Sequence, residues 1–221
     1  MDKKKLSNII TQLFWTFVIG CFIGYVIETV VVIFQGNYEI KKGLIYGPFI
    51  PVYGIGMVIY HLILSNLKIC KYSKVKQIVI VLILTMVLGG TIEYLCSFIQ
   101  EKCFGFISWD YSYLKFNLDG RTSLKHSLYW GILGVVYYIV GVPNIQKINK
   151  IASGKKFKII TTVCAILMTL DIGISALAVH RQYERRENIE ANSFVDRILD
   201  SKYTDEYLSQ IYKCTKEISN N

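Results

Sequence analysis

The sequence predicts an all-α integral membrane protein, in which a polytopic bundle of about five transmembrane helices precedes a short, polar, helical C-terminal tail. The 221-residue chain is 52% hydrophobic and has a mean hydropathy of +0.38, which is unusual for a soluble domain. It also contains apolar windows of about 20 residues, the length at which an α-helix crosses roughly 30 Å of hydrocarbon. We therefore expect a transmembrane domain over residues 1–180 and a tail over residues 181–221. The expected spans are residues 13–34, 49–67, 78–99, 124–142 and 159–179.

The first window follows a lysine-rich start, MDKKK, that is similar to the charged region of a signal peptide. The apolar run after it is too long for a signal peptide and contains Glu28, so we interpret it as a retained helix. The connections after the second and fourth windows are also rich in lysine, which favours a cytoplasmic N-terminus. We expect a multi-pass protein of the bacterial cytoplasmic membrane. Its tail lies outside the cell if all five helices span, and inside if one does not.

The second window begins in the proline- and glycine-rich stretch GLIYGPFIPVYGIG. Pro48 and Pro51 restrict how the chain enters the helix. The stretch is compatible with a re-entrant segment, which a membrane tolerates where protein or water satisfies the backbone.

The first and third windows share the pattern G-x-x-I-E-x6-Q, over residues 24–35 and 89–100. The helices that follow them also begin similarly, with YGIG at Tyr53 and WGILG at Trp130. A duplicated two-helix unit explains this match, and so does coincidence in apolar sequence. In a duplication, both copies would run in the same direction, as a parallel repeat.

The fourth window is a weaker candidate for a membrane span, because Lys125 and His126 lie at its start. The lysine side chain can extend from the helix end to the lipid headgroups. The fifth window contains Asp171. The sequence beyond it is polar and charge-mixed, and Ser193 and Thr204 are the expected N-caps of two short amphipathic helices. This tail is either a solvated appendage or an element that docks a partner.

Carboxylates inside the apolar windows are candidate functional groups, because an aspartate at the centre of a membrane helix costs about 2.5–3.5 kcal/mol. Glu28 and Glu93 each lie four residues after a glycine, so we expect both to face neighbouring helices, near the outer leaflet. They are substrate-binding or proton-linked candidates, or they hydrogen-bond to tyrosine or arginine and fix the bundle. Asp171 is a secondary candidate, with Tyr46 and Pro48 of the first connection.

The connection before the fourth window concentrates polar and aromatic residues in FGFISWDYSYLKFNLDGRTSLKHS. The aromatic residues fit an interfacial belt. Arg121 is the expected countercharge for Glu28 or Glu93, or a fork for an anionic substrate group. This connection contributes four site candidates, which are Trp109, Asp110, Asn117 and Arg121.

The net charge of +9 lies in clusters beside the expected spans, which favours anionic lipid headgroups over nucleic acid as partners. The six cysteines form no CxxC pair, and we expect neither a metal nor a cofactor. The chain has no P-loop pattern, so we expect no intrinsic ATPase activity. No residue stands out as catalytic, and whether the protein is an enzyme stays open.

Several short motifs together resemble one family. GYVIET, GLIYGPFIPVYGIG, GTIEY, WDYS, N-x-x-GR and SLYWGILG, spread over residues 14–142, are similar to those of the bacterial membrane proteins called Putative ABC-transporter type IV, or ABC-transporter permeases. Members commonly have a tryptophan two residues before the first membrane glutamate, where this chain has Val26. The resemblance implies a transport permease that works with a separate ATPase subunit on a small molecule or lipid. The residues also fit a membrane-embedded enzyme acting on a lipid or lipid-linked substrate, and a non-catalytic sensor or assembly partner.

Overall fold

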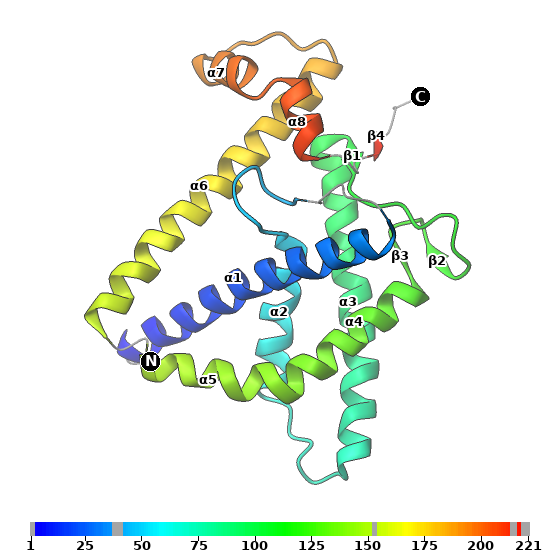
Figure 1. Cartoon of the computed structure of the whole chain (residues 1–221), viewed down its shortest axis with the longest axis vertical. Helices are drawn as coiled ribbons and strands as arrows, with labels where there is room; N and C mark the ends of the chain where they lie inside the picture. The colour runs from blue at the N-terminus through cyan, green and yellow to red at the C-terminus, as the bar shows by residue number, and fades with distance from the viewer. Residues whose placement is uncertain (1–2, 37–41, 152–153, 213–215, 218–221) are drawn as a thin grey trace.

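The computed structural model describes residues 3–36, 42–151, 154–212 and 216–217. It confirms the all-α fold class, and the protein is a multi-pass membrane helix bundle (Figure 1). Among the described residues, four helical stretches are long and apolar enough to cross a membrane. They are α1 (Lys3–Phe34), α3 (Lys74–Phe104), the stretch that begins with α4 (Leu124–Val136), and α6 (Lys155–Arg186).

The second expected span contains a shorter helix, α2 (Pro51–Leu64), of 14 residues. Its length falls below the roughly 20 residues needed to cross the hydrocarbon. A proline opens the helix, where its missing N–H costs no hydrogen bond. At the other end, the side chains of Ser65 and Asn66 donate to carbonyls of the last turn. Whether five segments cross the membrane therefore stays a prediction.

The helix of the fourth expected span continues beyond residue 142. After α4 the chain forms a π-helical turn, η1 (Tyr137–Gly141), and then α5 (Val142–Ile151). Pro143 explains the wider turn, because it has no N–H to donate four residues back. The Val142 N–H donates to the carbonyl of Tyr137, five residues back.

The membrane helices form two pairs, α1 with α2 and α3 with α4. α1 and α4 run in opposite directions across Figure 1, while α2 and α3 run in opposite directions along its long axis. The closest approaches in the two pairs involve glycines, which let helices come together. Phe17 and Cys21 of α1 cover Gly54 of α2.

The second pair repeats this contact at the corresponding positions of the G-x-x-I-E alignment. Leu82 and Met86 of α3 cover Gly131 of α4. Likewise, Gly20 of α1 lies against Gly54, and Thr85 of α3 donates to the carbonyl of Gly131. The same contacts thus recur at matched positions of the two helix pairs.

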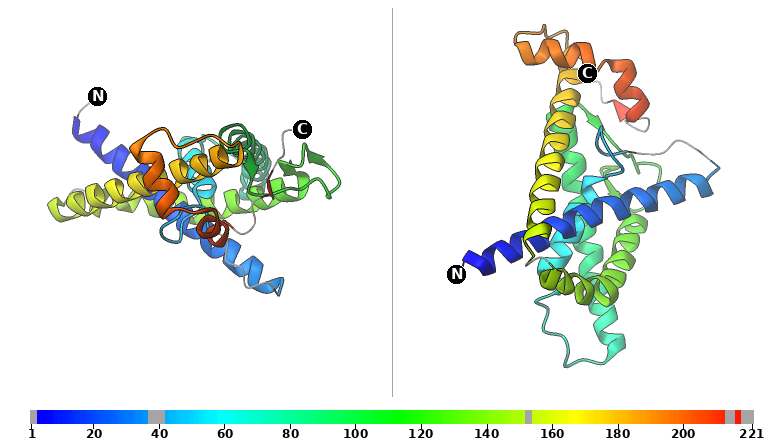
Figure 2. Two further views of the ribbon diagram at one scale, coloured as in Figure 1. Left: turned by 90° about the horizontal axis from the view of Figure 1, so that it is seen from above. Right: turned by 60° about the vertical axis from the view of Figure 1, so that its left-hand side comes forward.

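The tail folds onto the C-terminal end of α6, which itself continues to Arg186, beyond the domain boundary expected at residue 180 (Figures 1 and 2). Ser193 and Thr204 are the N-caps of α7 (Phe194–Lys202) and α8 (Asp205–Ile211), as predicted. The described part of the tail is not a solvated appendage, because its apolar side chains join a buried cluster with the first connection and α6. That cluster consists of Ile45, Ala178, Leu199, Leu208 and Ile211.

The connection between α3 and α4 lies against α3 and contains short strands. β2 (Asn117–Leu118) pairs with β3 (Thr122–Ser123) in an antiparallel hairpin. β1 (Phe106–Ile107) pairs with β4 (Lys216–Glu217) near the end of the chain. This connection is therefore ordered over the end of α3 that carries Glu93.

Candidate functional site

Each of the two membrane glutamates lies beside an aromatic residue of the partner helix. In the first pair, the Tyr53 ring packs on Gly24 of α1, and its hydroxyl donates to Glu28 Oε1 over 2.7 Å. In the second pair, Trp130 packs on Gly89 of α3, and its side chain lies near Glu93. The missing side chain of each glycine leaves room for the ring. Both glutamates thus face a neighbouring helix, as predicted.

The two rings meet, which brings the two glutamates into one site. The centroids of Tyr53 and Trp130 lie 5.0 Å apart, with the ring planes tilted by 33°. Tyr53 bonds Glu28, and Trp130 lies near Glu93, so the two glutamates lie on either side of this aromatic contact. Glu93 is buried, with 6% of its surface exposed, while Glu28 is half-buried. The site therefore combines one carboxylate from each helix pair.

The connection between α3 and α4 supplies two more donors to Glu93. Thr122 Oγ1 donates to Glu93 Oε2 over 2.7 Å, and the Tyr111 hydroxyl donates to Glu93 Oε1 over 3.2 Å. Burial, followed by the nearby carboxylates, raises the pKa of Tyr111, so the phenol stays a donor. The ring of His126 stacks on the ring of Tyr111, with their centroids 3.6 Å apart. His126 also bonds Ser123 at the helix start, the local role that lone histidines commonly have.

Three of the predicted site residues shape this connection. The Trp109 indole donates to the carbonyl of Arg121 over 2.8 Å. Asp110 Oδ1 accepts from the Ser112 N–H, and Asn117 Oδ1 accepts from the Gly120 N–H, both over 2.9 Å. Gly120 has a φ of 66°, a left-handed conformation that glycine adopts without strain. Their hydrogen bonds place Tyr111 and Thr122 beside Glu93.

Arg121 does not serve as the countercharge of Glu28 or Glu93, contrary to the prediction. Its guanidinium forms an ion pair with Glu101, two turns further along α3, and donates to Ser97 Oγ over 3.3 Å. It also lies over the rings of Tyr94 and Phe98, at 5.8 and 5.5 Å from their centroids. The side chain of Arg121 is 13% exposed. The pairing anchors the connection to α3.

The secondary candidates belong to a different place in the structure. Asp171 of α6 accepts from the Tyr46 N–H over 3.1 Å and from Ser175 Oγ over 3.3 Å. Ser175 Oγ in turn accepts from the Ile45 N–H over 2.9 Å. Asp171 thus fixes the first connection, in which Pro48 is half-buried, to α6. One backbone N–H and one side-chain hydroxyl therefore satisfy Asp171.

Sequence reasoning missed Tyr53, Tyr111, Thr122, Trp130 and Glu101. The signal for two of them was present, since Tyr53 and Trp130 begin the similar motifs YGIG and WGILG of the two units. A second repeated polar pair was also missed: Gln12 bonds His61 over 2.9 Å, and Gln77 bonds Tyr138 over 3.1 Å. Its members stand at matching positions in the two units. Within the part of the chain that the structure describes, no group of His, Cys, Asp and Glu side chains could hold a metal ion.

A comparison with protein families finds one family that matches this chain. The model of a family described as Putative ABC-transporter type IV matches residues 15–176. This match extends from the middle of α1 through most of α6, so it includes both glutamates and most of both helix pairs. Comparisons with curated proteins and with solved structures find no match.

Proposed function

Since the chain belongs to the Putative ABC-transporter type IV family and is a multi-pass membrane component of the transport type, we propose that it carries a cation through a site at Glu28 and Glu93. The convergence of these two carboxylates is the observation that carries the proposal. The basic side chain nearest in the connection, Arg121, is paired with Glu101. Glu93 is buried, and a positively charged occupant beside its carboxylate offsets part of the cost of removing that group from water.

The arrangement of the two units supports a transport role over a purely structural one. A carboxylate that only joins two helices requires one donor, whereas Glu93 has Thr122, Tyr111 and Trp130 around it. Sites at the interface of repeated units are common in transporters, because small movements of one unit against the other open or close them. The proposed site lies at such an interface, under the connection between α3 and α4.

The energy for transport comes, in this proposal, from a separate ATPase subunit that docks on the cytoplasmic side. The sequence has no P-loop with which the chain could bind ATP itself. We keep the orientation predicted from the lysines, which puts the glutamate site near the outer leaflet of the cytoplasmic membrane.

A ligand panel on the purified protein tests the proposal. Tetramethylammonium, spermidine, sodium and magnesium are compared with matched concentrations of acetate and phosphate. Saturable thermal stabilisation is read together with tryptophan fluorescence, to which Trp130 contributes. We expect at least one cation to stabilise the protein, and Glu93→Gln and Glu28→Gln to weaken its binding at least tenfold.

The matched control is Glu190→Gln, which removes an exposed carboxylate from the tail. It should keep the cation response of the unchanged protein. The proposal is wrong if no cation in the panel stabilises the protein, or if stabilisation survives in both glutamine variants. Lipid turnover that Glu93→Gln abolishes would instead favour the enzyme alternative.

A further inference from the structure

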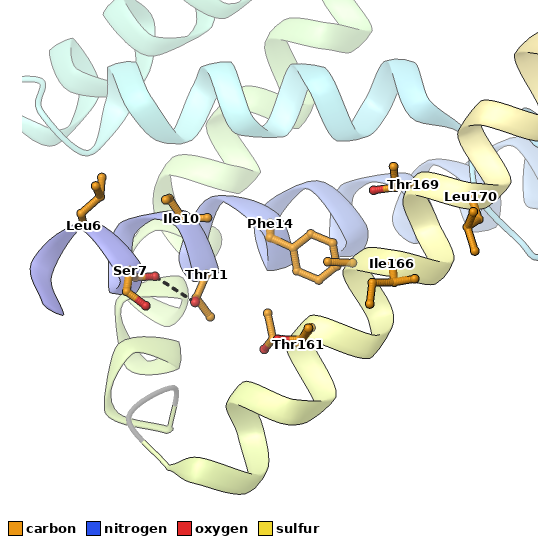
Figure 3. Close-up of a pocket in the computed structure, with 11 residues that line it drawn as sticks. Leu6, Ser7, Ile10, Thr11, Phe14, Thr161, Ile166, Thr169 and Leu170 are labelled. Atoms are coloured by element: carbon orange, nitrogen blue, oxygen red, sulfur yellow. Dashed lines mark hydrogen bonds between the residues drawn. The ribbon is translucent and has the colours of Figure 1, made fainter. Parts of the chain in front are cut away.

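A groove separates the first halves of α1 and α6, away from the glutamate site. It has a volume of about 700 Å³ and is lined by one face of each helix (Figure 3). Leu6, Ile10 and Phe14 line it from α1, and Ile166 and Leu170 line it from α6. All of these residues lie in candidate membrane spans, so the groove opens towards lipid.

The two helices touch beside the groove without closing it. The Trp15 indole donates to Thr161 Oγ1 over 3.0 Å, and its ring lies 5.7 Å from that of Phe157. Figure 1 shows α6 diverging from α1 beyond this end of the helices. Side chains along the opening stay partly exposed, with Ile10 at 59% and Ile166 at 55%. Nothing else in the described residues covers them.

Three of the five hydroxyl side chains that line the groove already donate a hydrogen bond within their own helix. The hydroxyls of Thr11, Thr161 and Thr162 each donate to a carbonyl four residues back in their own helix. With these donors satisfied, the groove presents mainly carbon atoms. The lined segments, residues 6–14 and 161–170, are about 12–14 Å long at 1.5 Å per residue. That length is close to the half-thickness of a bilayer core, about 15 Å.

Positive charge gathers at the end where both helices begin. α1 starts in the run MDKKK and α6 starts in the run GKKFK. Lys156 and Lys158 are exposed, and neither helix has an acidic residue in its first turn. An apolar slot one leaflet deep with lysines at its mouth matches a lipid that has an apolar chain and an anionic headgroup.

We propose that this groove is a binding site for one anionic phospholipid, with an acyl chain between α1 and α6 and the headgroup at the lysines. The bound lipid contacts the first halves of both α1 and α6. In this region the two helices contact each other directly through Trp15, which lies against Thr161 and Phe157. The site is independent of the proposed cation site, because the two share no residue.

Native mass spectrometry of the purified chain tests this proposal, with phosphatidylglycerol and phosphatidylcholine that carry identical acyl chains. We expect one phosphatidylglycerol to be retained in preference to phosphatidylcholine. Ala165→Phe places a ring in the groove and should abolish retention. Val163→Phe adds the same ring on the same helix outside the lining, and should retain the lipid.

A charge variant tests the headgroup part separately. Replacing Lys156 and Lys158 by glutamine should lower the preference for phosphatidylglycerol about 30-fold, roughly fivefold for each lysine near an anionic headgroup. Size-exclusion chromatography and circular dichroism select variants that fold like the original. Equal retention of the two lipids, or unchanged retention in Ala165→Phe, overturns the proposal. A lipid-free dimer that Ala165→Phe converts to a monomer also overturns it, because the occupant would then be a second copy.

Discussion

Tyr53 and Trp130 face each other at the interface of the two helix pairs, with ring centroids 5.0 Å apart. Each ring packs on the glycine that precedes its unit's glutamate by four residues; the Tyr53 hydroxyl donates to Glu28, and the Trp130 side chain lies near Glu93. One pair of equivalent aromatics therefore positions one pair of equivalent carboxylates. Each helix pair thus contributes one of the two acidic groups of the proposed site.

The hydrogen bond between Tyr53 and Glu28 should be measurable as a coupling. Tyr53→Phe keeps the ring on Gly24 and removes the donor, so we expect a loss of about 1–3 kcal/mol of stability. In a Glu28→Gln background the same change should cost less, with a coupling of about 0.5–3 kcal/mol. Denaturant unfolding in detergent measures both. Tyr113→Phe, at a 77% exposed position, is the control. Equal costs in both backgrounds would show that the bond contributes no stability.

Gly89 should tolerate no side chain. A Cβ there would lie 2.3 Å from Trp130 Cβ and 2.7 Å from the Tyr60 hydroxyl. We expect Gly89→Ala to lower stability by about 1–3 kcal/mol, because the overlap forces α3 and α4 apart. Gly173→Ala is the matched control on α6, since no atom lies within 4 Å of its new Cβ. Thermal unfolding of both proteins decides the point, and a Gly89→Ala protein as stable as the control would refute the packing.

Hydrophobic windows predicted the fold class well, because burying about 20 apolar residues in lipid leaves a helix as the main way to satisfy the backbone. Local signals also predicted the N-caps Ser193 and Thr204, since a cap depends on the three residues after it. The short α2 was not predicted. Its apolar composition fits a span, whereas its ends depend on Pro51 and on the side chains of Ser65 and Asn66.

Side-chain partners were harder to predict than helices. The sequence contains several carboxylates that could form an ion pair with Arg121. Which of them does so depends on how the hairpin β2–β3 lies on α3, and this placement brings Arg121 to Glu101. Asp171 appeared isolated because its donors, the backbone of the first connection and Ser175, include groups that have no signature in a hydropathy pattern. The pairing of Tyr53 with Trp130 follows from the packing of two units, which a single window does not reveal.

The Arg121–Glu101 ion pair should hold the connection over the glutamate site. Arg121→Glu places two negative charges together, and we expect faster hydrogen exchange throughout residues 105–123, by about tenfold or more for a loss above 1.4 kcal/mol. Adding Glu101→Arg restores opposite charges and should recover part of the protection. Lys115→Glu makes the same type of charge change at an exposed position and should leave exchange unaltered. Failure of the double variant to recover protection would assign the effect to something other than this pair.

Docking of the tail should depend on pH through Asp200. Arg181, only 3% exposed, donates from Nε and Nη2 to the two oxygens of Asp200, each over 3.0 Å. These hydrogen bonds hold the pKa of Asp200 below its ordinary value. A carboxylate with a lowered folded-state pKa stabilises the docked form fully above its unfolded pKa of about 3.9. That stabilisation is lost as the pH falls through the folded-state pKa, so docking should be constant from pH 7 to about 5 and weaken below about 4.

Spin labels at Ser112→Cys and Ser201→Cys, in a cysteine-free background, report this docking as a distance between two exposed positions. We expect a narrow distance distribution at pH 7 that broadens in acid. Asp200→Asn should broaden it already at pH 7, because a neutral amide cannot match the bidentate ion pair with Arg181. Glu206→Gln, which neutralises an exposed carboxylate of α8, should behave like the original chain. If Asp200→Asn kept the narrow distribution, docking would rest on the buried cluster around Leu208 rather than on the ion pair.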